Sequence, residues 1–323
     1  MIFRNRLFLT IIFLIILLII NINCAKRKST RLRILVSPKA VVHSFWVTVK
    51  AGADSAGNEL NVDVIWKGPK SETNIDNQMS IIEDYINQRV DAIVIAATDS
   101  KALIPVIKRA VSENIPVITI DSGVDSDDPV SFIATDNILG ANMAGRTLVN
   151  LIGRSGKVAC IPFVPGSATS IWRETGFKEE IKKYPNVELA AVQYSLSDVA
   201  TAMAVTEDIL TAFPDLAGIF AANEAGAIGA SQALLARGLA GKVKLVAFDA
   251  ASNEIEALKK NIIQALIVQN PFKMGYLGVK TAVDVINGKK VPKRIDTGVS
   301  VVTMENLYSE EIQKFLFPAG KTD

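Results

Sequence analysis

The chain has 323 residues, of which 49% are hydrophobic and 21% are charged, and its formal net charge at pH 7 is +2. This length exceeds that of one ordinary domain, so one large α/β unit or two lobes are expected. The charge is close to neutral, and Lys and Arg are spread along the chain except near its N-terminus. Composition therefore gives no reason to expect a protein that binds nucleic acid.

The N-terminal segment has the pattern of a bacterial export signal. Arg4 and Arg6 precede an apolar run from Leu7 to Ile20, and the short polar segment "NINC" follows. A basic start, an apolar centre and a polar exit are typical of export signals. The run is also shorter than the roughly 20 residues that a membrane-spanning helix usually needs.

Cys24 stands at the end of this segment, where a lipoprotein carries its acylated cysteine. Asn21 and Asn23 occupy positions at which such signals usually have Leu and a small residue. We expect residues 1–24 to be a signal peptide with lipid attachment at Cys24, followed by a tether over residues 25–30. An uncleaved N-terminal anchor is the alternative. Either way, the product is expected on the periplasmic side of the cell envelope, held at a membrane.

From residue 31 onward, short apolar runs alternate with longer amphipathic segments. Runs rich in Val and Ile suit strands that are buried on both faces of a parallel sheet. The segments between them carry apolar residues at helical spacing, and the pattern is that of successive βαβ units in a doubly wound sheet. The expected strands are 32–37, 62–66, 91–97 and 115–121, and the expected helices are a stretch ending near Leu60, 78–89 and 102–114.

A second train of similar size begins after residues 131–137, where a strand is expected to run directly into a helix. Its expected strands are 157–163, 187–194, 216–223, 244–249 and 262–270, with helices 172–184, 202–213, 226–238 and 274–289. No linker rich in Pro, Gly or Ser separates the trains. We therefore expect two similar Rossmann-like lobes of parallel sheets flanked by helices, joined by a multi-crossing hinge. The expected N-terminal lobe is 31–134 plus about 271–294, and the C-terminal lobe is 135–270 plus about 295–323.

Polar residues follow the apolar runs in both lobes. Ligands of open α/β sheets bind outside the carboxyl ends of the strands, so these positions are candidates for ligand contact. Each one alone is weak evidence, because Asx residues commonly cap the helix that follows a strand. Their recurrence in both lobes predicts a cleft between two sets of facing strand ends. The residues are Asp121, Asp136, Asn137, Asn223, Asp249 and Gln269.

Eight stretches of the chain, in this order, resemble the periplasmic ribose-binding protein family, the sugar-binding subunits of ABC importers. They are "ILVSPKAVVHSFW", "DAIVIAATDS", "NIPVITIDS", "FIATDNILGANMAG", "RETGF", "AFPDLAGIFAANEAGAIGA", "LVAFDA" and "LIVQNPFKMGYLGV". The resemblance runs from about Arg31 to Val302. It implies the type I fold of periplasmic binding proteins, in which two lobes close over a solute.

The resemblance also implies which residues bind the solute. The two adjacent aromatics that cover a sugar ring in the family fall on Phe45 and Trp46, and a family Asn falls on His43. The Arg of the "RETGF" motif is Arg173. The predicted ligand-binding residues are His43, Phe45, Trp46, Asp121, Asn137, Arg173, Asn223, Asp249 and Gln269.

This set also suits a sugar on chemical grounds. Carboxylates accept hydroxyl protons, Arg donates, amides do both, and aromatic faces cover C–H surface.

The chain departs from the family pattern at several positions. Ala96 and Ser122 replace an Asn and an Arg of the ribose binder, and a small residue near Ser197 replaces the aromatic of the C-terminal lobe. The identity of the sugar is therefore left open.

Rival functions have less support. No second His and no Cys cluster accompany His43, so no metal site is expected. The segment "GRSGK" lacks the spacing of a phosphate-binding loop, and no nucleophile elbow is present. A repressor would need a helix-turn-helix where the export signal stands.

We expect no enzyme and no cofactor, but a monomeric binder of a monosaccharide or related polyol. It would deliver this solute to an ABC permease and its ATPase, and would not bind nucleic acid. The alternative is a ligand sensor that presents its closed form to a membrane receptor or histidine kinase.

Overall fold

A computed structural model describes residues 31–317 of the chain. The predicted signal peptide, Cys24 and tether lie outside these residues, as do residues 318–323. By its internal contacts the chain divides into residues 1–32 and residues 33–323, and the fold below is that of the second unit. None of the helices in residues 31–317 is both long and apolar enough to cross a bilayer.

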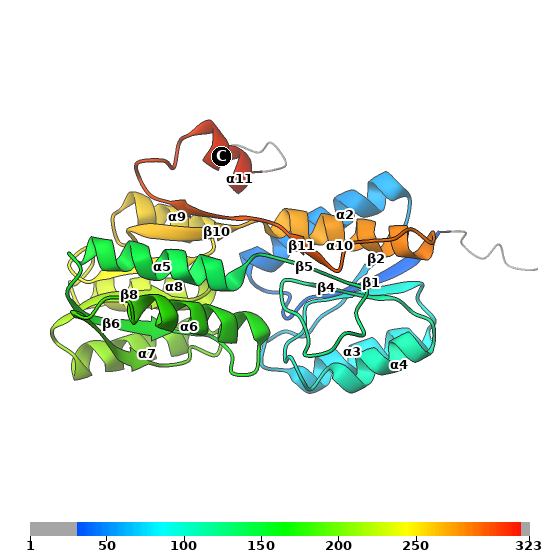
Figure 1. The fold of residues 1–323 in the computed structure, drawn as a ribbon, viewed down its shortest axis with the longest axis horizontal. Helices are drawn as coiled ribbons and strands as arrows, with labels where there is room; N and C mark the ends of the chain where they lie inside the picture. The colour runs from blue at the N-terminus through cyan, green and yellow to red at the C-terminus, as the bar shows by residue number, and fades with distance from the viewer. Residues whose placement is uncertain (1–30, 318–323) are drawn as a thin grey trace, which may run out of the picture. The chain divides into compact units, whose positions relative to one another are not determined.

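The N-terminal lobe is built on a parallel sheet of six strands in the order β11-β5-β4-β3-β1-β2 (Figure 1). The strands are short and apolar because both of their faces are covered. Their bounds are β1 Arg33–Ser37, β2 Asp63–Trp66, β3 Ala92–Ile95, β4 Val117–Ile120, β5 Ser131–Ala134 and β11 Arg294–Asp296.

Four helices cover this sheet, two on each face. Helices α3 (Ile75–Asn87) and α4 (Ile104–Ser112) bury Ile93, Ile95 and other side chains of one face. Helix α10 (Pro271–Ile286) packs against the alternate residues, since Gly278 lies against Val94 and Ile120. Successive strand residues therefore face opposite helical layers, as the period of a strand requires.

Helix α2 (Ser44–Leu60) packs on α10 at unusually close range. A Cβ added at Gly275 would lie 1.9 Å from the carbonyl oxygen of Val49, and one added at Gly52 would lie 2.0 Å from that of Phe272. Any side chain at either position would push the two helices apart. This contact joins segments more than 200 residues apart and brings α10 back to the N-terminal lobe.

The C-terminal lobe has a second six-stranded sheet, in the order β12-β10-β9-β8-β6-β7. All its pairs are parallel except β10 with β12, which are antiparallel. The antiparallel edge strand was not predicted. The bounds are β6 Gly156–Ile161, β7 Val187–Val192, β8 Leu216–Ala221, β9 Lys244–Phe248, β10 Ala265–Gln269 and β12 Val299–Val302.

Two separate apolar layers cover the faces of this second sheet. Helices α5 (Asn137–Leu151) and α6 (Ala168–Ile181) bury one face, which includes Cys160. The opposite face packs against α7 (Val199–Ala212), α8 (Glu224–Ala236) and α9 (Ser252–Lys259), and the segment that carries α11 (Glu310–Leu316) joins the same core through Ile312.

The chain crosses between the lobes three times: from β5 to α5, from β10 to α10 and from β11 to β12. Two of these segments are bonded side by side. The amide of Thr297 donates to the carbonyl oxygen of Ala134 at 3.2 Å, and the hydroxyls of Thr135 and Thr297 lie 3.3 Å apart. The predicted fold class, two similar lobes joined by a multi-crossing hinge, is confirmed.

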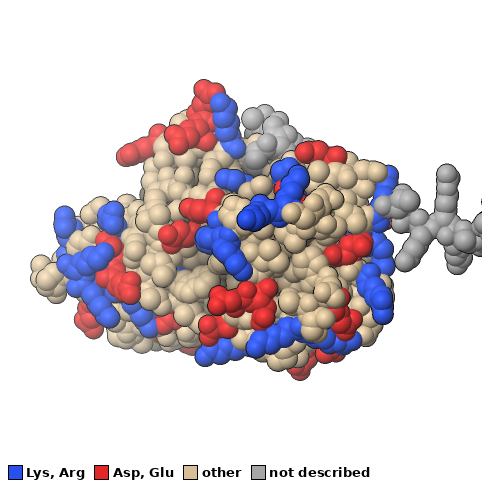
Figure 2. Space-filling model, turned by 45° about the vertical axis from the view of Figure 1, so that its right-hand side comes forward, with Lys and Arg blue, Asp and Glu red and all other residues tan. Residues whose placement is uncertain are grey.

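The surface carries both signs of charge. On the face shown in Figure 2, acidic and basic side chains are intermingled, and no single sign dominates a broad area. A face of this kind does not offer the continuous basic strip that a nucleic-acid backbone requires.

Candidate functional site

A small polar cavity lies where the carboxyl ends of the strands of both sheets meet. Its volume is about 20 Å³, room for about one water molecule. A larger solute can enter only if the lobes separate or wall side chains move. The walls are formed by Lys39, His43, Phe45, Trp46, Glu72, Asp121, Phe163, Arg173, Asn223, Glu224, Asp249 and Gln269.

Two aspartates stand at equivalent places in the two lobes. Asp121 follows β4 and Asp249 follows β9, and both are buried. Their φ angles are 53° and 87°, in the left-handed region that residues with a side chain rarely adopt. Each bends the chain sharply after its strand and turns its carboxylate to the cavity. Strained backbone of this kind clusters at functional sites.

Arg173 of α6 is held on three sides. Its Nε donates to Asn137 Oδ1 at 2.8 Å, and one terminal nitrogen donates to the carbonyl oxygen of Ala222 at 2.8 Å. Its guanidinium carbon lies 3.6 Å from the ring centre of Phe248. Burial lowers the pKa of Arg173, while the charges of Asp249 and other carboxylates raise it. The remaining N–H groups are left for the cavity, in a fixed planar orientation.

Asn137 therefore has a different place from the one that the sequence predicts. It is the only member of the predicted ligand-binding set that does not line the cavity. Its amide nitrogen donates to the carbonyl oxygen of Thr135, and its oxygen is used by Arg173. As the first residue of α5, it turns back toward the hinge and holds the guanidinium of Arg173.

Asp249 and Gln269 are bonded to each other on the C-terminal side, and Asn223 has separate partners. Gln269 donates to Asp249 Oδ1 at 2.6 Å, and the other carboxylate oxygen accepts from the amide of Glu224. Asn223 caps α8 through Gly226 and donates to the hydroxyl of Ser197 at 2.8 Å. Burial raises the pKa of Asp249, although the charge of Arg173 and the bond from Gln269 counteract it.

Aromatic side chains enter the cavity from both lobes. Phe45 and Trp46 lie edge to face with ring centres 4.9 Å apart. Phe163, just after β6, supplies an aromatic from the C-terminal lobe. Position 197 is a serine, and the aromatic of this lobe comes from a different strand end.

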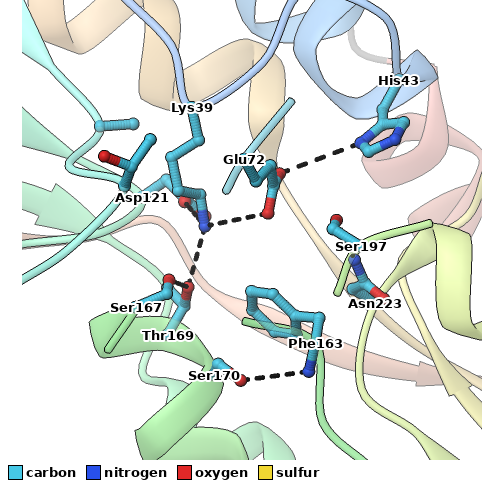
Figure 3. Close-up of polar contacts among 12 residues, drawn as sticks. Lys39, His43, Glu72, Asp121, Phe163, Ser167, Thr169, Ser170, Ser197 and Asn223 are labelled. Atoms are coloured by element: carbon cyan, nitrogen blue, oxygen red, sulfur yellow. Dashed lines mark hydrogen bonds and ion pairs between the residues drawn. The ribbon is translucent and has the colours of Figure 1, made fainter. Parts of the chain in front are cut away.

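Lys39 and Glu72 were missed by sequence reasoning, although both are buried in the cavity wall (Figure 3). Lys39 Nζ lies 3.0 Å from Asp121 Oδ2, and it donates to Thr169 Oγ1 of the C-terminal lobe at 3.0 Å. Trp46 Nε1 donates to Glu72 Oε1 at 3.0 Å, and His43 Nδ1 lies 3.9 Å from the same oxygen. His43 thus stands beside a carboxylate and not beside a metal ligand cluster.

The charge of Glu72 follows from these neighbours. Burial by itself would raise the pKa of Glu72, but the charges of Lys39 and His43 and hydrogen bonds from Trp46 and Ser197 bring it below its ordinary value. Glu72 is therefore ionised at neutral pH and can only accept hydrogen bonds.

Glu224 was also missed, and it links the two lobes. Its carboxylate accepts from the amides of Ser44 at 3.1 Å and Phe45 at 2.9 Å, which are the first residues of α2. These amides have no partner within their own helix, and the helix dipole favours a negative charge there. A carboxylate of the C-terminal lobe thus caps a helix of the N-terminal lobe.

Three acceptor atoms of the wall are not satisfied by the protein. Glu72 Oε2 and Gln269 Oε1 are buried and receive no hydrogen bond from residues 31–317. Asp121 Oδ2 forms the ion pair with Lys39 but no aligned hydrogen bond. Buried acceptors of this kind are costly to leave unpaired. Within the described residues no group of three or more His, Cys, Asp or Glu is placed to hold a metal ion.

Residues 34–290 match the family model described as the periplasmic binding protein domain. The chain belongs to this family. The ribose import binding protein of Haemophilus influenzae is 32% identical over 259 residues, covering 80% of this chain and 87% of the relative. That of Bacillus subtilis is 28% identical over 283 residues, covering 88% and 90%.

Solved structures of this family agree with the fold. An ABC transporter solute-binding protein of Agrobacterium vitis with bound D-fucose has a TM-score of 0.86 and 37% identity, covering 88% of this chain and 99% of its own. A carbohydrate transporter solute-binding protein of Agrobacterium radiobacter in complex with D-arabinose has a TM-score of 0.87 and 35% identity, covering 90% and 100%. These relatives are named as binding proteins and not as enzymes, in agreement with the prediction that this periplasmic binding protein catalyses no reaction.

Proposed function

We propose that this protein is the sugar-binding component of a bacterial ABC import system. It captures a monosaccharide or related polyol in the cavity between its lobes and presents the closed form to a membrane permease with its ATPase. Family membership and the sugars bound by relatives support this proposal. None of the relatives reported above is named as a sensor, so the alternative of signalling to a receptor or kinase gains no support.

The observation that carries the proposal is the set of unsatisfied acceptors on the cavity wall. Three acceptors of the wall can receive hydrogen bonds from hydroxyl groups: Glu72 Oε2, Asp121 Oδ2 and Gln269 Oε1. Arg173 has N–H donors that its protein partners do not use. A sugar supplies hydroxyls that both donate and accept. The rings of Phe45 and Phe163 can cover its C–H surface. The nine predicted ligand-binding residues remain part of this proposal, with Asn137 as the one that acts through Arg173.

Binding and closure are coupled in this account. Only the closed form contacts a solute from both lobes, so a solute favours closure by its differential affinity for the two states. The cavity is too small for a sugar as it stands, so the lobes must open or wall side chains must move to admit one. The predicted lobe boundaries, 31–134 with about 271–294 and 135–270 with about 295–323, define the two bodies that would move.

Anchoring at the membrane is a separate part of the proposal. We infer that the protein is exported, carries lipid on Cys24 and acts as a monomer. Mass spectrometry of the protein extracted from membranes tests the lipid. A lipid adduct on Cys24 is expected, and an unmodified Cys24 in an intact N-terminal segment would show the uncleaved anchor instead.

The test of the sugar site is a thermal-shift and calorimetry screen of pentoses, hexoses and polyols against the wild type and two variants. Ligands that bind only the folded state raise the melting temperature by mass action. Arg173→Ala and Asp249→Asn should each weaken binding of the selected sugar at least about tenfold, because each removes charge-assisted hydrogen bonds. Unchanged affinity in both folded variants would disprove the assignment of the site.

A further inference from the structure

Lys39 is the most unusual residue of the cavity wall, because it is a lysine that is only 3% exposed. Its ammonium lies between two aromatic rings, 5.6 Å from the centre of Trp46 and 5.1 Å from that of Phe163. Asp121 provides the opposite charge at 3.0 Å. Aromatic faces and a carboxylate together stabilise a desolvated cation. The ammonium is thus held in one place, charged, at the junction of the lobes.

The hydrogen-bonding capacity of Lys39 is not used up by these neighbours. An ammonium has three N–H donors. One bonds Thr169 Oγ1, and Asp121 Oδ2 lies 3.0 Å away in an ion pair that has no aligned hydrogen bond. Even with a second N–H directed at Asp121, the third has no acceptor at hydrogen-bonding distance among residues 31–317. The nearest candidate, Glu72 Oε2, lies 4.0 Å away, which is too far for a direct hydrogen bond.

Glu72 has the buried acceptor that faces this unused donor of Lys39. Its Oε1 is fixed by the bond from the indole of Trp46, so the orientation of the carboxylate is set. Its Oε2 is then directed toward Lys39 and receives no hydrogen bond (Figure 3). A buried donor and a buried acceptor therefore face each other at 4.0 Å, a separation that one oxygen atom beside both can bridge.

We propose that Lys39 and Glu72 form a subsite that reads one hydroxyl group of the bound sugar. The hydroxyl oxygen, placed about 2.8 Å from each group, accepts a hydrogen bond from the ammonium and donates its proton to Glu72 Oε2. Only a group that both accepts and donates satisfies the pair. An ether oxygen would leave the carboxylate unpaired, and a C–H group would leave both unpaired.

This subsite is completed when the lobes close. Lys39 and Glu72 belong to the N-terminal lobe, whereas Thr169 and Phe163 belong to the C-terminal lobe. Closure fixes the ammonium from the far side and directs its free donor. The inference rests on the proposed function, and it adds which residues discriminate among sugars that differ by one hydroxyl.

The experiment is a cycle that combines protein variants with deoxy sugars. The probes are D-ribose, D-arabinose and D-fucose, each with its series of monodeoxy analogues, and the assay is titration calorimetry. Variants are Lys39→Met, which keeps the apolar stem, Lys39→Gln, which keeps a donor, and Glu72→Gln. Lys50→Met is the control, because Lys50 is 44% exposed on α2 and pairs with Asp54. Thermal unfolding shows which variants fold.

We expect one deoxy analogue to bind the wild type at least about tenfold more weakly than its parent sugar. Lys39→Met and Glu72→Gln should weaken the parent by a similar factor, yet weaken that one analogue less than threefold. All other analogues should lose affinity in parallel with the parent, and Lys50→Met should change nothing.

Three results would overturn the inference. Equal losses for every sugar would show that Lys39 and Glu72 only support the wall, and unchanged affinities would show that they do not contribute. If the wild type binds none of the three sugars or their analogues, the proposed function fails and this inference with it. Binding without the selective coupling overturns the subsite alone.

Discussion

The contact between Glu224 and the start of α2 gives the sharpest quantitative prediction. Both carboxylate oxygens are used, one by the amide of Ser44 and one by the amide of Phe45. The two partners belong to different lobes, so the bonds exist only while the lobes are closed. Removing the carboxylate should therefore lower the stability of the closed form without disturbing either lobe.

The magnitude follows from the number and kind of bonds. Hydrogen bonds to a charged group contribute about 1.5–3 kcal/mol each. Taking the low end for a partly buried contact, the two bonds sum to about 3 kcal/mol, and 1.4 kcal/mol corresponds to a tenfold change in an equilibrium constant. Glu224→Ala should raise the sugar Kd roughly a hundredfold. Glu224→Gln keeps one acceptor and should raise it about tenfold.

Calorimetry gives the affinities, and small-angle scattering reports the separation of the lobes. Glu224→Ala should need far more sugar than the wild type to reach the compact form, and the loss should be the same for every sugar that binds. Glu256→Gln is the control, since Glu256 is exposed on α9 and pairs only with Lys259 in the part of the chain described. An affinity within a factor of two of the wild type would refute the closure role of Glu224.

Two further predictions concern stability. Burial and the charges of Asp249 and Glu224 raise the pKa of Glu254 well above 4.5. Between the pKa of the unfolded chain and this raised pKa, the folded protein holds a proton on Glu254 that the unfolded chain releases. The free energy of unfolding therefore falls as pH rises through that range. Glu254→Gln keeps the acceptor for the amide of Ala251, so it should melt a few degrees above the wild type at pH 8 and gain less near pH 4.5; an equal shift at both pH values would contradict the buried proton. Gly275→Ala should lower the melting temperature by several degrees, because its Cβ would lie 1.9 Å from a carbonyl oxygen. Gly123→Ala, whose Cβ would meet Phe132 at an ordinary 3.5 Å, should change it little, and equal melting of the two variants would argue against the tight packing of α2 on α10.

The fold could be predicted because burial on both faces leaves a strong record in the sequence. Strands such as Ala92–Ile95 and Val117–Ile120 are fully buried, and their residues are apolar except for Thr119. The strand-end rule then found Asp121 and Asp249, since a parallel sheet brings those ends to one edge. The antiparallel edge strand β12 was not predicted, because the exposed side of an edge strand has a weaker apolar pattern.

The other residues of the site could not be predicted, because their roles depend on where their side chains point. The position of a residue in the sequence does not determine that direction. Asn137 follows a strand like the other candidates, but as the first residue of α5 it turns back to Arg173. Lys39 and Glu72 lie in loops beyond the strand ends, and charged residues there are usually solvated. Only the closed arrangement of two lobes shows that both are buried and face each other. The proline between Phe163 and the preceding strand was the available signal that this aromatic leaves the sheet.

The most direct test of the central claim is a crystal structure of the protein grown with the sugar that binds most tightly in the screen. We expect the sugar between the two lobes, with its hydroxyls bonded to Arg173, Asp249 and Asp121 and its ring against Phe45 or Phe163. A sugar bound elsewhere on the protein, or held in the cleft without contact to Arg173 and Asp249, would contradict it.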